Sequence, residues 1–391
     1  MTLIQQLAAR GVRFLAPETV YIAPDVNPER IAPDVTVHLG CRLSGANLSI
    51  GPGSVLGAEA PATVVDCQLG SKVHLAGGFF DRATFLDGFK AGSGAHVRPG
   101  CLFEEGSSIA HSVGVKQTVF LPWVTSGSLI NFCDCLMAGG TGRKDHSEIG
   151  SSYIHFNFTP HQDKATASLI GDVPRGVMLN QPAIFLGGQG GLVGPVSIEY
   201  GTVIPAGQVW RGDATEPGRL VAKPALRTAL DTSYDPRQYS GIQRVIRNNQ
   251  RYIGNILALD AWYRTVRARF MLADPFATAC HAGALQRISE ILDERLTRFD
   301  ELARKVERSL ALEKAYAAED EHRAFVTRWP AMKETLTATV RDRGTLAVPA
   351  SVTAIVAALP EAGDYLKTIQ SLPPEAAQTL TEWLEGIAAV S

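Results

Sequence analysis

Long apolar segments are missing from this sequence. No stretch reaches the roughly 18 consecutive apolar residues that a membrane-spanning helix needs. The opening segment MTLIQQLAARGVRFLAPE has apolar residues spaced as on an amphipathic helix and lacks the apolar core of a signal peptide. Cysteine is scarce as well, with 6 residues scattered through 391 positions, a usage typical of reduced thiols in the cytosol. We therefore expect a cytoplasmic protein without a membrane partner.

An excess of charge of either sign is also absent. Lys and Arg together number 37 and Asp and Glu number 39, which gives a formal net charge of -2. Such a balance provides no overall attraction to nucleic acid or to an anionic membrane. We expect no nucleic-acid partner, and any anion that the protein binds must be held by a local group of cations.

What the sequence does contain is a six-residue repeat. Apolar residues return at every sixth position, most clearly at Phe85, Ala91, Val97, Phe103, Ile109 and Val115. This period fits neither an α-helix nor an alternating strand, but it fits a coil of three short strands with one inward anchor per strand, about eighteen residues per turn. The hexad pattern is associated with left-handed coiling. We predict a left-handed parallel β-helix, preferred to a generic β-solenoid or a jelly roll because the hexads keep their register.

The second half of the sequence has a different period. Apolar residues recur at helical spacing from Ile242 to Phe270 and again from Leu285 to Leu310. Prolines then divide the tail into short segments, which we expect to be helices. The predicted organisation is an N-terminal helix or lead-in over residues 1–18, a β-helix over 19–222 and an α-helical domain over 235–391.

Four segments of the first half carry a resemblance to a known family. They are GVRFLAPETVYI, RPGCLFEEGSSIAHSVGVK, IGSSYIHFNFTPHQDK and LVGPVSIEYGTVIPAGQVWRGD. Together they resemble the acetyltransferase domain of the bifunctional bacterial enzyme that acetylates glucosamine 1-phosphate and then uridylylates it. The resemblance ends near Lys223. The uridylyltransferase domain has no counterpart in this sequence, so nucleotide transfer is not implied, and the helical half has no counterpart in the family.

The most specific match is an Arg-Pro-Gly segment followed one coil later by a Lys. In the family these two cations hold the sugar phosphate, and the matching residues are Arg98 and Lys116. Eighteen residues make one coil, so the two side chains should stack on one edge of the prism and converge on a phosphate dianion. The alternative interpretation is a pair of solvated surface cations.

The resemblance implies further site residues. Asn157 matches the Asn that contacts the acetyl donor and the substrate amide, while Phe158 replaces a Tyr. Lys164 matches the sugar-binding Lys if its loop carries a short insertion. Ala206 matches a backbone contact to coenzyme A, and Lys223 lies where the family has an Arg near the coenzyme. A Lys can pair with a phosphate there, but not in the bidentate manner of Arg.

The family's general base, a His, is not in register here. Counting forward from Lys116 by the family's spacing reaches Ser128, and counting backward from Asn157 reaches Asp134. The interval is six residues longer than in the family, so an insertion of hexad size lies within it. This insertion alters the edge that should carry the site.

Three histidines are candidates for the missing base, because the substrate ammonium must lose a proton before it attacks a thioester. His146 is the first candidate, since Asp145 and Glu148 are near enough in sequence to orient it. His155 and His161 flank Asn157 and come next. His155 occupies a hexad anchor position, so a buried ring inside the prism is an equal alternative for it.

Metal sites are disfavoured by the spacing of the possible ligands. Cys133 and Cys135 form a Cys-x-Cys pair, but no second pair accompanies them, so we interpret them as small core residues. The histidines do not match the pattern of the β-helical carbonic anhydrases that bind zinc at subunit interfaces. We expect no metal in the active site.

These observations lead to two hypotheses for function. In the first, the protein is a homotrimer with sites in clefts between adjacent prisms, and it transfers an acyl group from acetyl-CoA or another acyl-CoA to the amine of a hexosamine phosphate or nucleotide sugar. Arg98, Lys116 and Lys164 would hold the phosphate, Asn157 would position the acyl group, and His146 would accept the proton. In the second, the protein binds the sugar phosphate or sugar nucleotide, or serves in assembly, and has lost the base.

Overall fold

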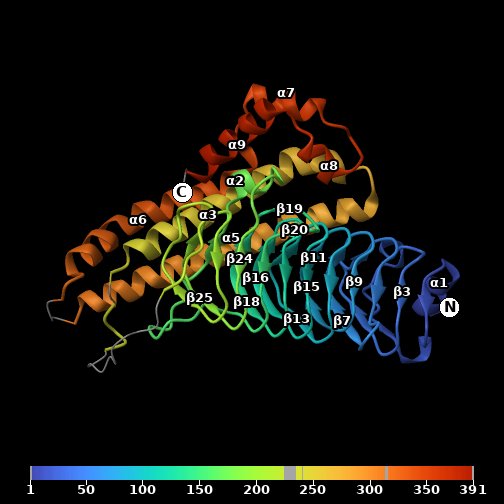
Figure 1. The fold of residues 1–391 in the computed structure, drawn as a ribbon. Helices are drawn as coiled ribbons and strands as arrows, with labels where there is room; N and C mark the ends of the chain where they lie inside the picture. Colours follow the sequence, from blue (N-terminus) through green and yellow to red (C-terminus); the bar gives the residue numbers. More distant parts are fainter. Residues whose placement is uncertain (1, 224–234, 240, 313–315, 390–391) are drawn as a thin grey trace.

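The computed structural model describes residues 2–389 except 224–234, 240 and 313–315. It consists of a parallel β-helix followed by α-helices that lie along it (Figure 1). The coils of the β-helix occupy residues 21–211 in about 11 turns. The predicted combination of a parallel β-helix with a helical C-terminal region is therefore confirmed.

Three faces, each of short parallel strands, form a prism. In the described residues the first face contains 10 strands, one from each successive coil. They are β1 (Arg13–Phe14), β3 (Thr36–Val37), β6 (Val55–Leu56), β9 (His74–Leu75), β12 (Lys90–Ala91), β15 (Ser108–Ile109), β17 (Thr125–Ser126), β21 (Glu148–Ile149), β24 (Phe185–Leu186) and β27 (Val203–Ile204).

The second and third faces are joined where two long strands, β16 (Gly114–Phe120) and β18 (Asn131–Met137), run from one face to the other. The other strands of the second face are β2 (Tyr21–Ile22), β4 (Arg42–Ser44), β7 (Ala62–Val65), β10 (Gly78–Asp81), β13 (Ala95–Val97), β22 (Ile154–Phe156), β25 (Gly191–Val193) and β28 (Val209–Arg211). Those of the third face are β5 (Ser49–Ile50), β8 (Gln68–Leu69), β11 (Ala83–Phe85), β14 (Cys101–Phe103), β23 (Ser168–Ile170) and β26 (Ser197–Ile198).

The corner between the second and third faces is made by residues in the left-handed conformation. Asp66, Arg82, Gln117 and Asp134 lie at this corner in four coils, with φ values of 48°, 44°, 51° and 60°. A single left-handed residue turns the chain sharply, so a strand can pass from one face to the next. We call this edge the second corner.

The interior of the prism contains the predicted anchors. Phe85, Ala91, Val97, Phe103, Ile109 and Val115 are all buried. Aromatic rings also stack from coil to coil, with Phe85 and Phe103 parallel at 5.4 Å between centroids and Phe120 edge-on to Phe103. Each coil therefore covers the core of its neighbour.

Most of the helices in the described residues follow the β-helix. Those before or within it are α1 (Leu3–Ala9) and α2 (Val173–Gly176). The others are α3 (Gln243–Trp262), which continues through a π-helical turn (Tyr263–Arg267) into α4 (Ala268–Met271), then α5 (Pro275–Leu310), α6 (Glu319–Asp342), α7 (Ala350–Ala358), α8 (Tyr365–Gln370) and α9 (Pro374–Ala388). None of the helices in the described part of the chain is long and apolar enough to cross a membrane.

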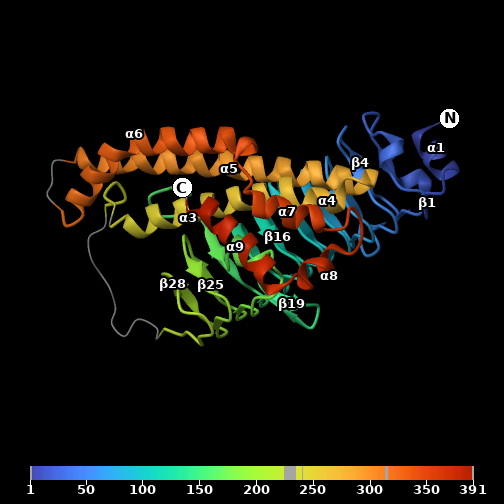
Figure 2. The same ribbon diagram turned by 90° about the horizontal axis from the view of Figure 1, so that it is seen from above.

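The third face is covered by α3 and α5, as the two views show (Figures 1 and 2). A Cβ atom on Gly283 of α5 would lie 2.2 Å from Oε1 of Gln68 and 2.6 Å from Oγ1 of Thr84, so the helix approaches the face closely at this glycine. In a later coil of the prism, Tyr263 donates a hydrogen bond of 2.6 Å to Glu104. Helices and prism therefore share one buried interface.

Candidate functional site

Arg98 and Lys116 lie on the same face, in neighbouring coils. The amide of Arg98 donates to the carbonyl of Val115, and the two preceding residues pair in register, His96 with Gly114 and Val97 with Val115. Both side chains are half-buried, so neither is sealed inside the prism. The guanidinium of Arg98 reaches past the coil of Lys116 to the coil after it, where Nη2 donates to Sγ of Cys133 at 3.1 Å. The predicted stacking of the two cations is therefore present.

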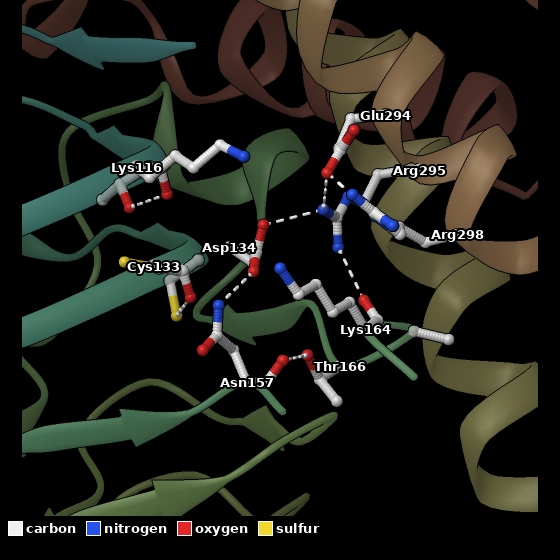
Figure 3. A network of polar contacts seen from close by, with 12 residues as sticks. Lys116, Cys133, Asp134, Asn157, Lys164, Thr166, Glu294, Arg295 and Arg298 are labelled. Atoms are coloured by element: carbon white, nitrogen blue, oxygen red, sulfur yellow. Dashed lines mark hydrogen bonds and ion pairs between the residues drawn. The ribbon is translucent and has the colours of Figure 1, made fainter. Parts of the chain in front are cut away.

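A carboxylate lies beside these cations at the second corner. Asp134 is 5% exposed, and its two oxygens accept hydrogen bonds from different parts of the chain (Figure 3). Nδ2 of Asn157 donates to one oxygen at 2.6 Å, and Nη2 of Arg295 donates to the other at 2.7 Å. The corner is thus held by a side chain from the β-helix and a side chain from α5.

Arg295 also fixes the loop that carries Lys164. Its Nη1 donates to the backbone carbonyl of Lys164 at 3.3 Å. The ammonium groups of Lys164 and Lys116 point into the same space next to Asp134 (Figure 3). Arg298 lies about one turn further along α5, and its charge is paired by Glu294 and Glu301. Sequence reasoning did not identify Arg295, because an arginine on an amphipathic helix is usually a surface residue.

The three candidate histidines take three different positions. The ring of His155 lies inside the prism, where its Nε2 is 2.8 Å from Oγ of Ser168, and burial lowers its pKa to about 4. The buried-ring alternative therefore describes its position. His146 lies on the hairpin of β19 (Gly140–Gly142) and β20 (Asp145–His146), which connects the third face to the first. The Asp134 carboxylate opposes this lowering of the His155 pKa, so the ring lies close to the second corner but on the inside of the prism, whereas the contacts of His146 are with Arg143 and Glu148 near its own hairpin.

His161 lies in a separate basic cavity of about 530 Å³ between the loop after Asn157 and the end of α5. Its ring stacks on Tyr239 with 4.1 Å between centroids, and its Nδ1 is 2.7 Å from the carbonyl of Pro236. The ammonium of Lys305 donates to the His161 carbonyl at 3.0 Å. These contacts hold the loop that contains His161 against α5 and against the segment of Pro236 and Tyr239.

The two residues expected near coenzyme A lie at another edge of the prism. Ala206 is exposed between β27 and β28, where the first face meets the second. The ammonium of Lys223 lies 4.3 Å from the centroid of the Trp210 ring and donates to the Arg211 carbonyl at 2.5 Å. One copy of the chain does not bring these residues to Arg98 and Lys116.

The side chains at the second corner favour neither a reactive thiol nor a bound metal ion. Cys133 is 2% exposed, and burial raises the pKa of its thiol to about 11, so it stays protonated at neutral pH. Within the part of the chain that the structure describes, no three His, Cys, Asp or Glu side chains gather as a possible metal site. The arrangement can hold an anion and hydrogen-bond an amide or amine.

Comparison with known proteins gives partial matches. No family model matches the chain. The bifunctional protein GlmU of Thermus thermophilus is 33% identical over 149 residues, which are 38% of this chain and 30% of that protein. GlmU of Trichlorobacter lovleyi is 27% identical over 219 residues, 56% of this chain and 42% of the relative, and GlmU of Thermotoga maritima is 25% identical over 211 residues, with 54% and 42% covered.

The chain thus spans less than half the length of these curated relatives. The similarity is distant and partial, and it accords with the hexapeptide-repeat fold of the prism. Over about half of its length, the chain is a distant relative of the bifunctional protein GlmU.

Proposed function

We propose that this protein binds a hexosamine phosphate or a nucleotide sugar and transfers an acetyl or other acyl group to its amine from an acyl-CoA. The proposal rests on one observation above the others. Arg98 and Lys116 stack on neighbouring coils with both side chains half-exposed, and Lys164 points into the same space from the adjoining loop. Three cations near one corner of the prism suit a phosphate group. The resemblance of the β-helix to an acetyltransferase domain supplies the reaction class.

Asn157 is proposed to orient the reacting amine. Its Nδ2 is occupied by Asp134, and its backbone carbonyl accepts from Oγ1 of Thr166 at 3.1 Å. These bonds fix the residue and leave its Oδ1 as an acceptor for the substrate. An oxygen held in this way can accept an N–H of the amine and hold it facing the thioester.

The acyl donor site is proposed to be completed by a second copy of the chain. Ala206 and Lys223 lie at a different edge from Arg98 and Lys116, so one prism provides one half of the site and its neighbour the other. A homotrimer with clefts between prisms has this property, and no metal is needed for the transfer. We propose acetyl-CoA as the donor, with the Lys223 ammonium close to one of its phosphates.

The base is proposed to come from the same neighbour. The amine must lose a proton before it attacks, and within one copy the second corner presents Asp134, whose two oxygens are already bonded to Asn157 and Arg295. The hairpin of His146 lies at a different edge, where its Nε2 is 3.9 Å from Glu148 and its Nδ1 is 3.0 Å from the carbonyl of Arg143. We propose that His146 of one copy serves the site of the next.

The phosphate role is tested by calorimetry with glucosamine 1-phosphate. Arg98→Ala should weaken binding by about tenfold or more, because a charge-assisted hydrogen bond contributes roughly 1.5–3 kcal/mol. Arg42→Ala is the matched control, since Arg42 is exposed on the same face and lies over the ring of Tyr21, several coils away. Equal affinity of the wild type and Arg98→Ala would overturn the assignment.

A second candidate function, binding without catalysis, is favoured by the position of His155, whose ring is close to Asp134 but is buried inside the prism, where burial lowers its pKa to about 4. A thiol-release assay with acetyl-CoA and glucosamine 1-phosphate separates the two. Turnover that is lost in His146→Ala supports the transferase. Sugar-phosphate affinity without any thiol release supports a binding or assembly protein.

A further inference from the structure

Next to the two cations, the second face carries a second set of outward side chains. Phe79, His96, Gly114 and Asn131 lie in register on four successive strands, β10, β13, β16 and β18. Outward positions two residues apart on a strand share a face. His96 therefore lies beside Arg98 and Gly114 beside Lys116. We call these four residues the platform.

The first part of the platform is aromatic. The rings of Phe79 and His96 have centroids 5.3 Å apart at an angle of 47°. Phe79 is 36% exposed and His96 is exposed, although apolar surface of this size is usually buried. Exposed aromatic rings side by side are the surface on which planar heterocycles stack.

The next position, Gly114, lacks a side chain, and we call the open space at its Cβ position the hollow. A Cβ atom built on it would meet one neighbouring atom within 4 Å, the carbonyl oxygen of Ile130 at 3.9 Å. The φ angle of Gly114 lies outside the left-handed region, so the backbone does not require a glycine. The missing side chain opens space between the ring of His96 and the amide of Asn131.

Asn131 closes the hollow with a hydrogen-bond donor. Its Oδ1 accepts from the thiol of Cys133 at 3.3 Å, and the same sulfur accepts from Arg98. These contacts orient the amide and leave its Nδ2 without a partner among the described residues. An N–H group at the edge of a hollow recognises a carbonyl oxygen on a heterocycle.

The distance between the platform and the two cations suits the distance between the base and the phosphates of one nucleotide. The two rows of outward side chains are about 7 Å apart along the strand, and successive coils are about 4.8 Å apart. A base on Gly114 and a diphosphate on Arg98 and Lys116 can therefore belong to one molecule. A sugar phosphate alone reaches the cations and leaves the platform empty.

We infer that the site takes a nucleoside diphosphate sugar whose base carries a carbonyl on its edge and stacks over Gly114 beside His96. This inference rests on the proposed function and selects one of its two substrate classes. Acyl transfer to such a substrate breaks the thioester C–S bond and forms the amide C–N bond. The amine proton passes to the base, and the thiolate leaves and is protonated.

Isothermal calorimetry with two probes tests the inference. UDP-N-acetylglucosamine and N-acetylglucosamine 1-phosphate differ only by the uridylyl group. The first should bind the wild type at least about tenfold more tightly, and ADP-glucose should show no such gain because adenine has no carbonyl on its edge. Gly114→Ala and then Gly114→Leu fill the hollow. They should remove, step by step, the extra affinity for UDP-N-acetylglucosamine, while the affinity for N-acetylglucosamine 1-phosphate stays constant. His96→Ala should reduce the gain as well.

Side chains are well tolerated on strands, so the Gly114 variants should fold, and circular dichroism checks this. Equal affinities for the two probes, with Arg98→Ala weakening both, would overturn the inference and leave the proposed phosphate site intact. Binding of neither probe would instead reject the proposed function itself. Gly114→Leu that separates the copies and weakens both probes equally would assign the platform to subunit contact, which also overturns the inference.

Discussion

The ion pair between Arg295 and Asp134 is closed off from solvent, with side chains 1% and 6% exposed. Removing one member of a buried pair leaves the other charge without compensation, at a cost of about 3–5 kcal/mol. Arg295→Ala should therefore destabilise the fold by that amount in urea unfolding. Arg298→Ala is the control: this arginine is 22% exposed, and its pairs with Glu294 and Glu301 should contribute about 1 kcal/mol or less. Similar losses of unfolding free energy in both variants would contradict the assignment of a buried, stabilising ion pair to Arg295 and Asp134.

Glu104 makes stability depend on pH. Burial raises its pKa to about 7, against the opposing effect of Arg267, and Tyr263 donates a hydrogen bond to it. The native state holds a proton that the unfolded chain releases near pH 4.5, so the stabilisation is complete below that pH and is lost as pH rises through 7.

The matching variant is Glu104→Gln, which is neutral at every pH. Its stability relative to the wild type should rise between pH 5 and pH 8, at about 1.4 kcal/mol for each pKa unit of the shift. Thermal unfolding across this range measures the difference. A difference that does not change with pH would contradict the assignment of a neutral Glu104 to the native state.

Helix α5 depends on a glycine where it meets the third face. Gly283→Ala places a methyl group against Gln68 and Thr84, so it should cost about 1–3 kcal/mol through overpacking. Gly386→Ala in α9 is the matched change, because no atom lies within 4 Å of its Cβ position. That variant should gain about 0.5–1 kcal/mol from helix propensity. Chemical denaturation of the two variants should therefore give opposite signs; a gain at Gly283 would mean that α5 does not sit closely on the prism.

The hexad pattern was sufficient to predict the strands of the β-helix, because an inward anchor such as Phe103 must recur once per strand. It also predicted the stacking of Arg98 and Lys116, which follows from the length of one coil. The site beyond these two residues was harder to predict. Arg295 is 161 positions from Asp134, and no local pattern joins a helical arginine to a particular carboxylate.

The face that the helices cover did leave a signal in the sequence. Leu102, Val119, Leu136 and Leu169 are buried although they alternate with the inward residues of the third face. A strand that is apolar on both sides is buried on both sides, so runs such as CLF, TVF, CLM and SLI indicate a covered face. The placement of α3 and α5 on that face was therefore open to prediction, unlike their individual contacts.

Since α3 and α5 occupy the third face, we expect copies of the molecule to associate through the other faces. Ile154, Phe156 and Val209 are each 41–43% exposed on the second face, and an apolar patch of this kind favours subunit contact. Ile154→Glu should dissociate the predicted homotrimer in sedimentation velocity. Phe185→Glu, at a 40% exposed position on the first face, should leave it assembled. A wild-type protein that sediments as a monomer would refute the proposal of sites shared between copies.

The measurement that tests the central claim most directly is a crystal structure with N-acetylglucosamine 1-phosphate bound. The account predicts that the phosphate lies between the guanidinium of Arg98 and the ammonium of Lys116, with the Lys164 ammonium in contact with the same ligand. A phosphate found elsewhere, for example in the basic cavity of His161 and Arg308, with Arg98 and Lys116 left in water, would contradict it.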